Sequence, residues 1–225
     1  MQPDPAAAVV LFSGGQDSTT CLAWALRQYR RVEAVTIDYG QRHRVELECA
    51  RAIAERCGVP HRILPCDSFT ALGGNSLVSE EVVRDGVRQD TGLPNTFVPG
   101  RNLIFLCLVA AYAWQRSIAN LVTGVCQTDF SGYPDCRQTT MDALQAALRA
   151  GMDWPFTIHT PLMFLTKADS VRLAVDLDAL PLLALSHTCY NGSRPPCGTC
   201  PACLLRAKGF AEAGIADPLT ASPIR

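Results

Sequence analysis

Hydrophobic residues fall along the chain in two alternating patterns. One is a short continuous apolar run of strand length, as over residues 6–12, and the other repeats apolar residues every three or four positions, as over residues 18–29. Along the rest of the chain the two patterns predict strands over 32–38, 61–64, 120–125, 157–160 and 182–186, and helices over 45–57, 102–115, 137–150 and 166–177. Gly58 and Gly151 are expected to end the helices before them, and Thr166 to cap the helix after it.

Strands that alternate with helices predict the α/β class, with a mostly parallel sheet and helices on both of its faces. Ligands of such sheets bind beyond the carboxyl ends of the strands. The loops in that position span residues 13–18, 38–44 and 124–137, each directly after an expected strand. Residues 66–100 have little periodicity, and a segment of that length in a compact domain is typical of a lid, a binding loop or disorder.

Composition narrows the class of protein further. Apolar residues make up 48% of the 225 residues, which is enough for one sizeable core. The net charge of −1 gives no overall attraction for nucleic acid or an anionic membrane, and no apolar run approaches the ~18 residues of a membrane span. The start of the chain has no basic region or cleavage site typical of a signal peptide. We therefore expect a cytoplasmic protein with no nucleic-acid or membrane partner.

The first loop, SGGQDS at residues 13–18, has the composition of an anion site. Small residues let backbone N–H groups turn toward a phosphate chain, and the helix that follows adds its positive end. Asp17 suits a Mg²⁺ ion that accompanies the phosphates. The loop is neither a Walker A motif nor a dinucleotide fingerprint, because it lacks their glycine spacing and the lysine of the former. The alternative is a tight turn in which Asp17 or Ser18 only caps the helix.

The loop at residues 124–137 is rich in groups that recognise a purine-like acid. Its carboxylates, Asp129 and Asp135, suit the N–H pair of a guanine-like edge, while Tyr133 can stack on a purine face. Arg137 can hold a carboxylate with two hydrogen bonds. Arg101 stands at the start of an expected helix, where a cation opposes the helix dipole, and this suggests an anionic ligand nearby. Solvated surface charges are the alternative for each of these groups.

A cysteine cluster stands near the end of the chain. Four of the eleven cysteines lie within fifteen residues, separated by glycine, proline and asparagine, namely Cys189, Cys197, Cys200 and Cys203. Two-residue gaps let neighbouring sulfur atoms meet on one ion, so we expect a tetrahedral Cys₄ site, with zinc preferred over an iron–sulfur cluster. Four sulfur ligands leave no open position for water, so the site is expected to be structural.

Five motifs together resemble a known family. They occur in the order FSGGQDSTTCL, IDYGQRHR, PNTFVPGRN, TGVCQTDFSGYPDCR and CYN…CGTCPACLLRAKGF. The first contains the SGGxDS pattern of the PP-loop, the pyrophosphate-binding loop of ATP pyrophosphatases. As a set, from about Val9 to about Gly214, the motifs resemble the 7-cyano-7-deazaguanine synthases. The resemblance implies a Rossmann-like, adenine nucleotide alpha hydrolase-like domain over residues 1–180 that binds ATP, and a zinc-binding segment over residues 181–225 packed on that domain.

The resemblance also implies a reaction. ATP would adenylate 7-carboxy-7-deazaguanine, ammonia would displace AMP to give the amide, and a second activation by ATP would remove the amide oxygen to leave a nitrile. This step belongs to queuosine biosynthesis. Mg²⁺, one Zn²⁺ per subunit and a homodimer are implied as well.

Roles in ATP binding and activation follow from the motif positions. Asp17 would assist Mg²⁺, and Lys167, at the start of a helix, would stabilise charge on the transferred phosphate oxygens. A solvated surface lysine is the alternative for Lys167. The nucleotide-binding residues implied by the motif are Phe12, Ser13, Gly14, Gly15, Gln16, Asp17, Ser18, Thr19, Thr20, Cys21 and Leu22.

Roles in substrate binding stay divided among residues of two motifs. Asp129 or Asp135 would read the deazaguanine edge, with Tyr133 beside the ring, and Arg101 or Arg137 would hold the substrate carboxylate.

Other functions also fit parts of the sequence. A tRNA-modifying thiolase or a lysidine-forming ligase would share the PP-loop, but would have to hold a polyanion, and the chain is slightly acidic. A non-catalytic nucleotide-binding zinc module would share both the loop and the cysteines. A DNA-modification or defence pathway could use the same nitrile chemistry.

Overall fold

The structure is a computed structural model that describes residues 2–41, 44–72, 87, 89, 91–128 and 133–221. A five-stranded sheet lies at its centre, with the strand order β3-β2-β1-β4-β5 and parallel pairing throughout. The strands are β1 (Asp4–Leu11), β2 (Arg31–Asp38), β3 (His61–Pro65), β4 (Ile118–Val122) and β5 (Thr157–His159). The helices are α1 (Gln16–Gln28), α2 (Val45–Arg56), α3 (Ser68–Leu72), α4 (Arg101–Trp114), the 3₁₀ turn η1 (Pro134–Cys136), α5 (Gln138–Met152), α6 (Lys167–Asp176), α7 (Leu180–Leu183), α8 (Pro201–Ala213) and α9 (Pro218–Ala221).

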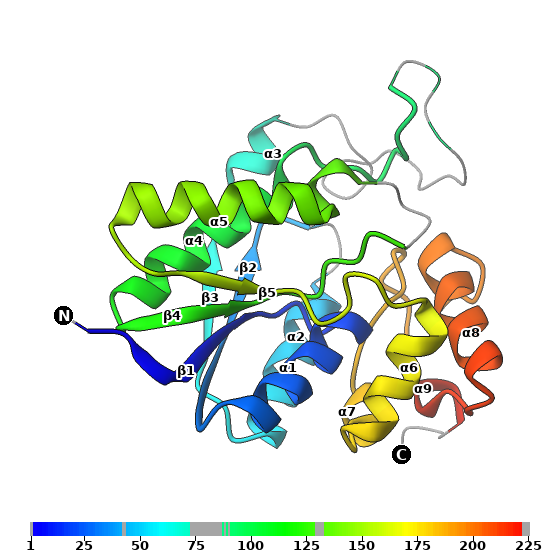
Figure 1. Cartoon of the computed structure of the whole chain (residues 1–225). Coiled ribbons are helices and arrows are strands. Elements are labelled where there is room, and N and C mark those ends of the chain that lie inside the picture. The colour runs from blue at the N-terminus through cyan, green and yellow to red at the C-terminus, as the bar shows by residue number, and fades with distance from the viewer. Residues whose placement is uncertain are drawn as a thin grey trace.

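Helices cover both faces of the sheet, as Figure 1 shows: α4 and α5 lie on one face, and α1 and α2 on the other. Alternate residues of β1 enter the two cores, because successive side chains of a strand point to opposite faces. Ala7 and Val9 pack with α4, whereas Ala8 and Val10 pack with α1 and α2. A strand buried on both faces has no polar alternation, which explains the continuous apolar run of β1. The predicted α/β class with a parallel sheet is confirmed.

Two predicted details are wrong. Residues 182–186 form the end of helix α7 and a turn instead of a strand, because Leu183 packs with α1, α6 and α8 at the side of the molecule, away from the sheet. A short apolar run fits a strand or a buried helix equally well from its periodicity. Gly151 does not end α5, which continues through Met152; Asp153 takes the left-handed conformation, with φ of 46°.

The cap predicted for α6 is confirmed. The Thr166 hydroxyl accepts a hydrogen bond from the Asp169 N–H, and the Asp169 carboxylate accepts one from the Thr166 N–H, which makes a capping box. This cap fixes Lys167 as the first residue of α6. Of the expected lid or binding loop over residues 66–100, the structure describes α3 and residues 91–100; residues 73–86, 88 and 90 lie outside its description. None of the described helices has the length and apolar character needed to cross a bilayer.

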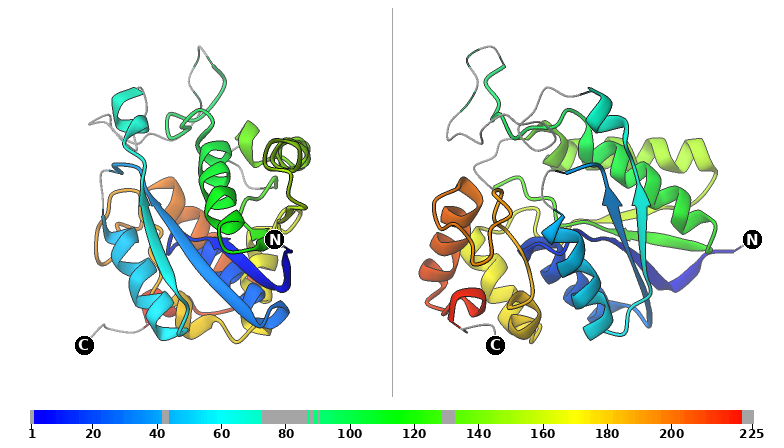
Figure 2. Two further views of the ribbon diagram at one scale, coloured as in Figure 1. Left: turned by 90° about the vertical axis from the view of Figure 1, so that its left-hand side faces the viewer. Right: turned by 180° about the vertical axis from the view of Figure 1, so that it is seen from behind.

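The C-terminal part of the chain packs beside α6, as the rear view in Figure 2 shows for α8. A Cβ atom at Gly209 of α8 would lie only 2.6 Å from Cγ of Lys167, so glycine permits this close approach. Arg206 of α8 is 3% exposed and binds Asp217 through two hydrogen bonds of 2.7 and 2.8 Å. The same guanidinium donates to the Ser186 hydroxyl at 2.8 Å. Arg206 therefore ties α8 and α9 to the segment that follows α7.

Candidate active site

A pocket of about 330 Å³ opens at the carboxyl ends of the strands. All three loops expected there contribute to its wall, from residues 13–18, 38–44 and 124–137. Side chains of α2, α4 and α6 and of the segment after α7 complete it. The parallel sheet brings these distant parts of the chain together, because all its strands end at the same edge.

The PP-loop turns sharply at Gly14, which has φ of 79° and lies against helix α2. A Cβ atom at this position would stand 2.6 Å from the Ala50 nitrogen and 2.8 Å from the Glu46 carbonyl oxygen, both in the backbone of α2. Next in the loop, the Ser13 and Ser18 hydroxyls lie 3.0 Å apart and hydrogen-bond to each other. The loop is thus held in a fixed shape before any ligand arrives.

We expect Gly14→Ala to lower the free energy of unfolding by about 3 kcal/mol, because the methyl group adds a collision with α2 to the strain of a left-handed backbone. Gly58→Ala is the matched control: Gly58 also has a positive φ, of 64°, but nothing lies within 4 Å of its Cβ position. The control should lose only about 1 kcal/mol. Chemical denaturation measures both values, and equal losses in the two variants would contradict the close contact at Gly14.

Asp17 and Lys167 form an ion pair across the pocket. Nζ of Lys167 lies 2.9 and 2.7 Å from the two carboxylate oxygens of Asp17, although the residues are 150 positions apart. The Lys167 side chain is only 11% exposed, which argues against the alternative of a solvated surface lysine. The pair places a cation and a carboxylate beside the first turn of α1, where phosphate oxygens and their metal ion would lie.

Gln16 gives independent support for a ligand at the loop. Its side chain is 3% exposed and lines the pocket, yet neither its amide nitrogen nor its oxygen has a hydrogen-bond partner in the described structure. An unsatisfied buried amide costs free energy that a bound polar ligand recovers. The residues present therefore fit a nucleotide, and one carboxylate beside a phosphate site fits Mg²⁺, which binds through few protein ligands.

Arg101, the first residue of α4, also lines the pocket. Its guanidinium carbon lies 5.9 Å from the ring centre of Tyr39. Burial by itself lowers the pKa of Arg101, but the oxygen atoms of Tyr39, Tyr133 and Tyr190 raise it, and the net pKa lies above the usual range. Arg101 is therefore a permanent cation at the pocket wall.

Glu46, in the first turn of α2, also lines the pocket. Burial raises the pKa of its carboxyl group to about 7, and the positive charge of Arg101 opposes part of that rise. The group thus changes charge near neutral pH.

The other expected substrate residues have different placements. Tyr133 lines the pocket, and its hydroxyl hydrogen-bonds to Thr96 at 2.5 Å. Asp135 is 5% exposed and accepts a hydrogen bond from the Asn102 N–H at 3.0 Å, which caps the first turn of α4. Neither Asp135 nor Arg137 is among the described residues that line the pocket. Asp129 lies outside the described residues.

The residues that the first motif implies for nucleotide binding lie partly in the loop and partly in the core. Phe12, Ser13, Gly15, Gln16, Asp17 and Ser18 line the pocket. The last four residues of the stretch are fully buried, namely Thr19, Thr20, Cys21 and Leu22. Cys21 and Leu22 pack α1 against the sheet, and none of the four is among the pocket-lining residues that the structure describes.

The segment after α7 closes one side of the pocket with Thr188 and Tyr190. Its backbone also holds the PP-loop, because the His187 N–H donates a hydrogen bond of 3.0 Å to the Gly14 carbonyl oxygen. The imidazole Nε2 of His187, 2% exposed, donates in turn to the Cys189 carbonyl oxygen at 2.9 Å. His187 alone therefore links the PP-loop to the first cysteine of the cluster, through its backbone N–H and its imidazole.

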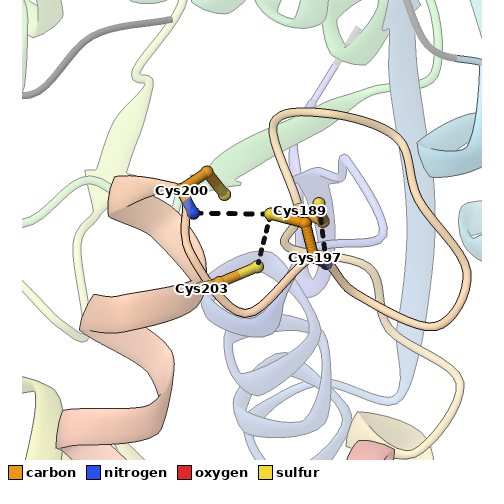
Figure 3. Close-up of side chains that lie close together, drawn as sticks. All are labelled: Cys189, Cys197, Cys200 and Cys203. Carbon is orange, nitrogen blue, oxygen red and sulfur yellow. Dashed lines mark hydrogen bonds between the residues drawn. The ribbon is translucent and has the colours of Figure 1, made fainter.

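The four cysteines converge on one point, as Figure 3 shows. All four sulfur atoms lie within 4.8 Å of one another, and they belong to Cys189, Cys197, Cys200 and Cys203. Hydrogen bonds from Thr199, followed by one from the Cys200 N–H, lower the pKa of Cys197 to about 5, which favours the metal-binding thiolate. This donor set fits a closed, four-coordinate zinc site.

Sequence reasoning missed three residues of the pocket: Glu46, His187 and Tyr190. Glu46 follows the second post-strand loop directly, in the first turn of its helix, and that position was a usable signal. Tyr190 stands between two expected metal ligands. The segment was therefore explained as a metal site, and its tyrosine was not considered for the pocket. No pattern in the sequence marks His187, whose role depends on a backbone contact with a loop over 170 residues away.

A parallel α/β sheet, the SGGxDS pattern of a PP-loop at the end of its first strand and a four-cysteine cluster together define the class of α/β protein to which the chain is compared. The family model "Queuosine biosynthesis protein QueC" matches residues 7–214. The chain is 62% identical to a 7-cyano-7-deazaguanine synthase of Chromobacterium violaceum, over 94% of this chain and 92% of the relative. It is 60% identical to the one of Laribacter hongkongensis, over 96% and 95% of the two chains. The chain belongs to the QueC family of queuosine biosynthesis.

Proposed function

We propose that this protein is a 7-cyano-7-deazaguanine synthase that joins 7-carboxy-7-deazaguanine to ammonia at the expense of ATP. The observation that carries the proposal is one pocket that contains both a PP-loop and Arg101, a permanent cation for a substrate acid. Family membership with relatives of that name supports the same reaction.

Two activations are needed because neither a carboxylate nor an amide loses oxygen readily in water. In the first, a carboxylate oxygen attacks the α-phosphorus of ATP and pyrophosphate leaves; ammonia then displaces AMP and gives the amide. In the second, the amide oxygen attacks the α-phosphorus of another ATP. The nitrogen then loses its protons, and the C–O bond breaks as AMP carries the oxygen away. The balance is two ATP consumed, with two AMP and two pyrophosphate formed, for each nitrile.

Residues in different parts of the pocket have different roles in the proposed reaction. Backbone N–H groups of the PP-loop, with the Ser13 and Ser18 hydroxyls, hold the departing pyrophosphate. Lys167 stabilises the negative charge that develops on the transferred phosphate oxygens. Asp17 holds Lys167 in place and would hold Mg²⁺, which neutralises phosphate charge when bound. The four cysteines would hold zinc, which would stabilise the segment that carries His187 and Tyr190. A homodimer in the cytoplasm is part of the same proposal.

A single assay tests this function. Purified protein is incubated with ATP, Mg²⁺, ammonium and 7-carboxy-7-deazaguanine, and the products are measured by mass spectrometry. We expect a nitrile product and two AMP for each nitrile. ATP binding without AMP release would instead indicate a non-catalytic nucleotide-binding module. Sedimentation of the same preparation measures the oligomeric state.

A further inference from the structure

Two carboxylates line the pocket in the described part of the chain, and their partners differ. They are Asp17 and Glu46. Both oxygens of Asp17 are engaged by Lys167, at 2.9 and 2.7 Å. No donor among the described residues hydrogen-bonds to the Glu46 side chain. Glu46 is therefore the pocket carboxylate that receives no side-chain hydrogen bond within the described structure, so its oxygens can still accept hydrogen bonds from a ligand.

Arg101 is the matching cation. It lines the same pocket, and no ion pair joins it to a carboxylate among the described residues, although Asp135 acts on it electrostatically and Tyr39 hydrogen-bonds to it. Glu46 and Arg101 influence each other electrostatically without forming a contact pair. A cation and an anion held apart in one desolvated pocket cost free energy unless a ligand pairs with each of them. The ligand that satisfies both has an acidic group at one place and adjacent N–H donors at another.

We propose that Glu46 is the residue that recognises the guanine-like edge of the substrate, by accepting hydrogen bonds from its ring N1–H and its exocyclic amine, while Arg101 binds the carboxylate. This inference rests on the proposed function. A carboxylate matches two adjacent donors, whereas the corresponding edge of adenine offers only one donor beside an acceptor, so Glu46 also selects against adenine-like substrates. The Tyr39 and Tyr133 rings at the same wall suit the flat faces of such a base.

The charged and titratable groups that act on Glu46 come from three sides of the pocket. Arg101 belongs to α4, Tyr39 to the loop after β2, and Tyr190 to the segment after α7, while Cys49 stands on α2 with Glu46 itself. Hydrogen-bond donors on the substrate favour the ionised carboxylate, so the substrate binds to the charged form of Glu46. Substrate affinity of the wild-type protein should therefore rise as pH increases from 6 to 8, across the pKa of about 7.

The test compares Glu46→Gln with Glu48→Gln, an exposed glutamate on the same helix. Calorimetry measures the dissociation constants of 7-carboxy-7-deazaguanine and of its analogue without the exocyclic amine, together with that of ATP. We expect Glu46→Gln to weaken binding of the acid by about 50-fold and to bind the acid and its analogue almost equally. ATP affinity should change less than about twofold, and Glu48→Gln should behave as wild type.

Three outcomes separate this inference from the proposed function. If the wild type forms the nitrile but Glu46→Gln keeps both its affinity and its discrimination against the analogue, Glu46 does not read the edge. If the wild type neither binds the acid nor releases AMP with it, the proposed function itself is wrong. Should Glu46→Gln fold poorly, Glu46→Asp replaces it, and weaker binding of the acid with partial loss of discrimination is the supporting result; unchanged values overturn the inference.

Discussion

The Asp17→Asn variant is expected to lose about three orders of magnitude in turnover while it keeps its fold. Asp17 is part of the PP-loop and pairs with Lys167, with 2.7 Å separating Nζ from the nearer carboxylate oxygen. Asparagine retains the size of the side chain but neither orients the lysine by charge nor binds a divalent cation strongly. The Asp17 side chain is 29% exposed, so the loss of stability should stay near 1 kcal/mol. Release of AMP at saturating ATP and acid measures the effect, and titration with Mg²⁺ should show a raised half-saturating concentration.

Asp178→Asn is the matched control for this variant. Asp178 forms an ion pair of 2.5 Å with Arg27 on the surface, with 84% of its side chain exposed. Its backbone is left-handed, with φ of 56°, a conformation that asparagine tolerates. This substitution should leave turnover unchanged. Nearly normal AMP release by Asp17→Asn would remove Asp17 from the catalytic machinery.

Cys200→Ser is expected to lose the metal and to lower the free energy of unfolding by about 3 kcal/mol or more, because metal binding contributes directly to folding free energy. The effect should also reach the PP-loop, since the His187 N–H that binds the Gly14 carbonyl oxygen lies two residues before Cys189. Bound zinc per chain falls from about one to near zero by elemental analysis. Affinity for ATP then falls together with thermal stability.

Cys57→Ser is the control for the chemistry of the substitution. Cys57 is a half-buried cysteine at the end of α2, outside the cluster, and its replacement should cost about 1 kcal/mol without any change in zinc content. A Cys200→Ser protein that is stable, free of metal and fully active would show that the cluster is not a structural metal site.

The cysteine segment and the PP-loop are directly connected by hydrogen bonds. His187 joins the two through hydrogen bonds to Gly14 and to Cys189, and Arg206 anchors the same segment to α8 and α9. If the cysteines bind zinc as proposed, a pocket wall attached in this way would depend on that metal although the metal takes no part in the chemistry. Substrate affinity should consequently decline before the sheet unfolds when a chelator removes zinc.

Local sequence patterns were enough to predict the features that depend on residues close together in the chain. The run of buried residues in β1 and the turn at SGGQDS specify a strand, a sharp loop and a helix in succession, because backbone hydrogen bonds and side-chain spacing act within a few residues. The two-residue gaps between Cys197, Cys200 and Cys203 likewise bring their sulfur atoms together without help from distant parts of the chain. The prediction failed at residues 182–186, where a short apolar run has no periodicity that distinguishes strand from helix.

By itself, therefore, the sequence determined most of the alternation of strands and helices, the sharp SGGQDS loop after the first strand and the cysteine cluster. Only the tertiary structure decided which charges meet: it joins Asp17 to Lys167, directs Asp135 to a helix cap, and leaves Glu46 and Arg101 facing one cavity. The reason is that parallel strands carry their loops to a common edge, so the partners of each side chain depend on strand order and helix packing, which no short stretch of sequence records.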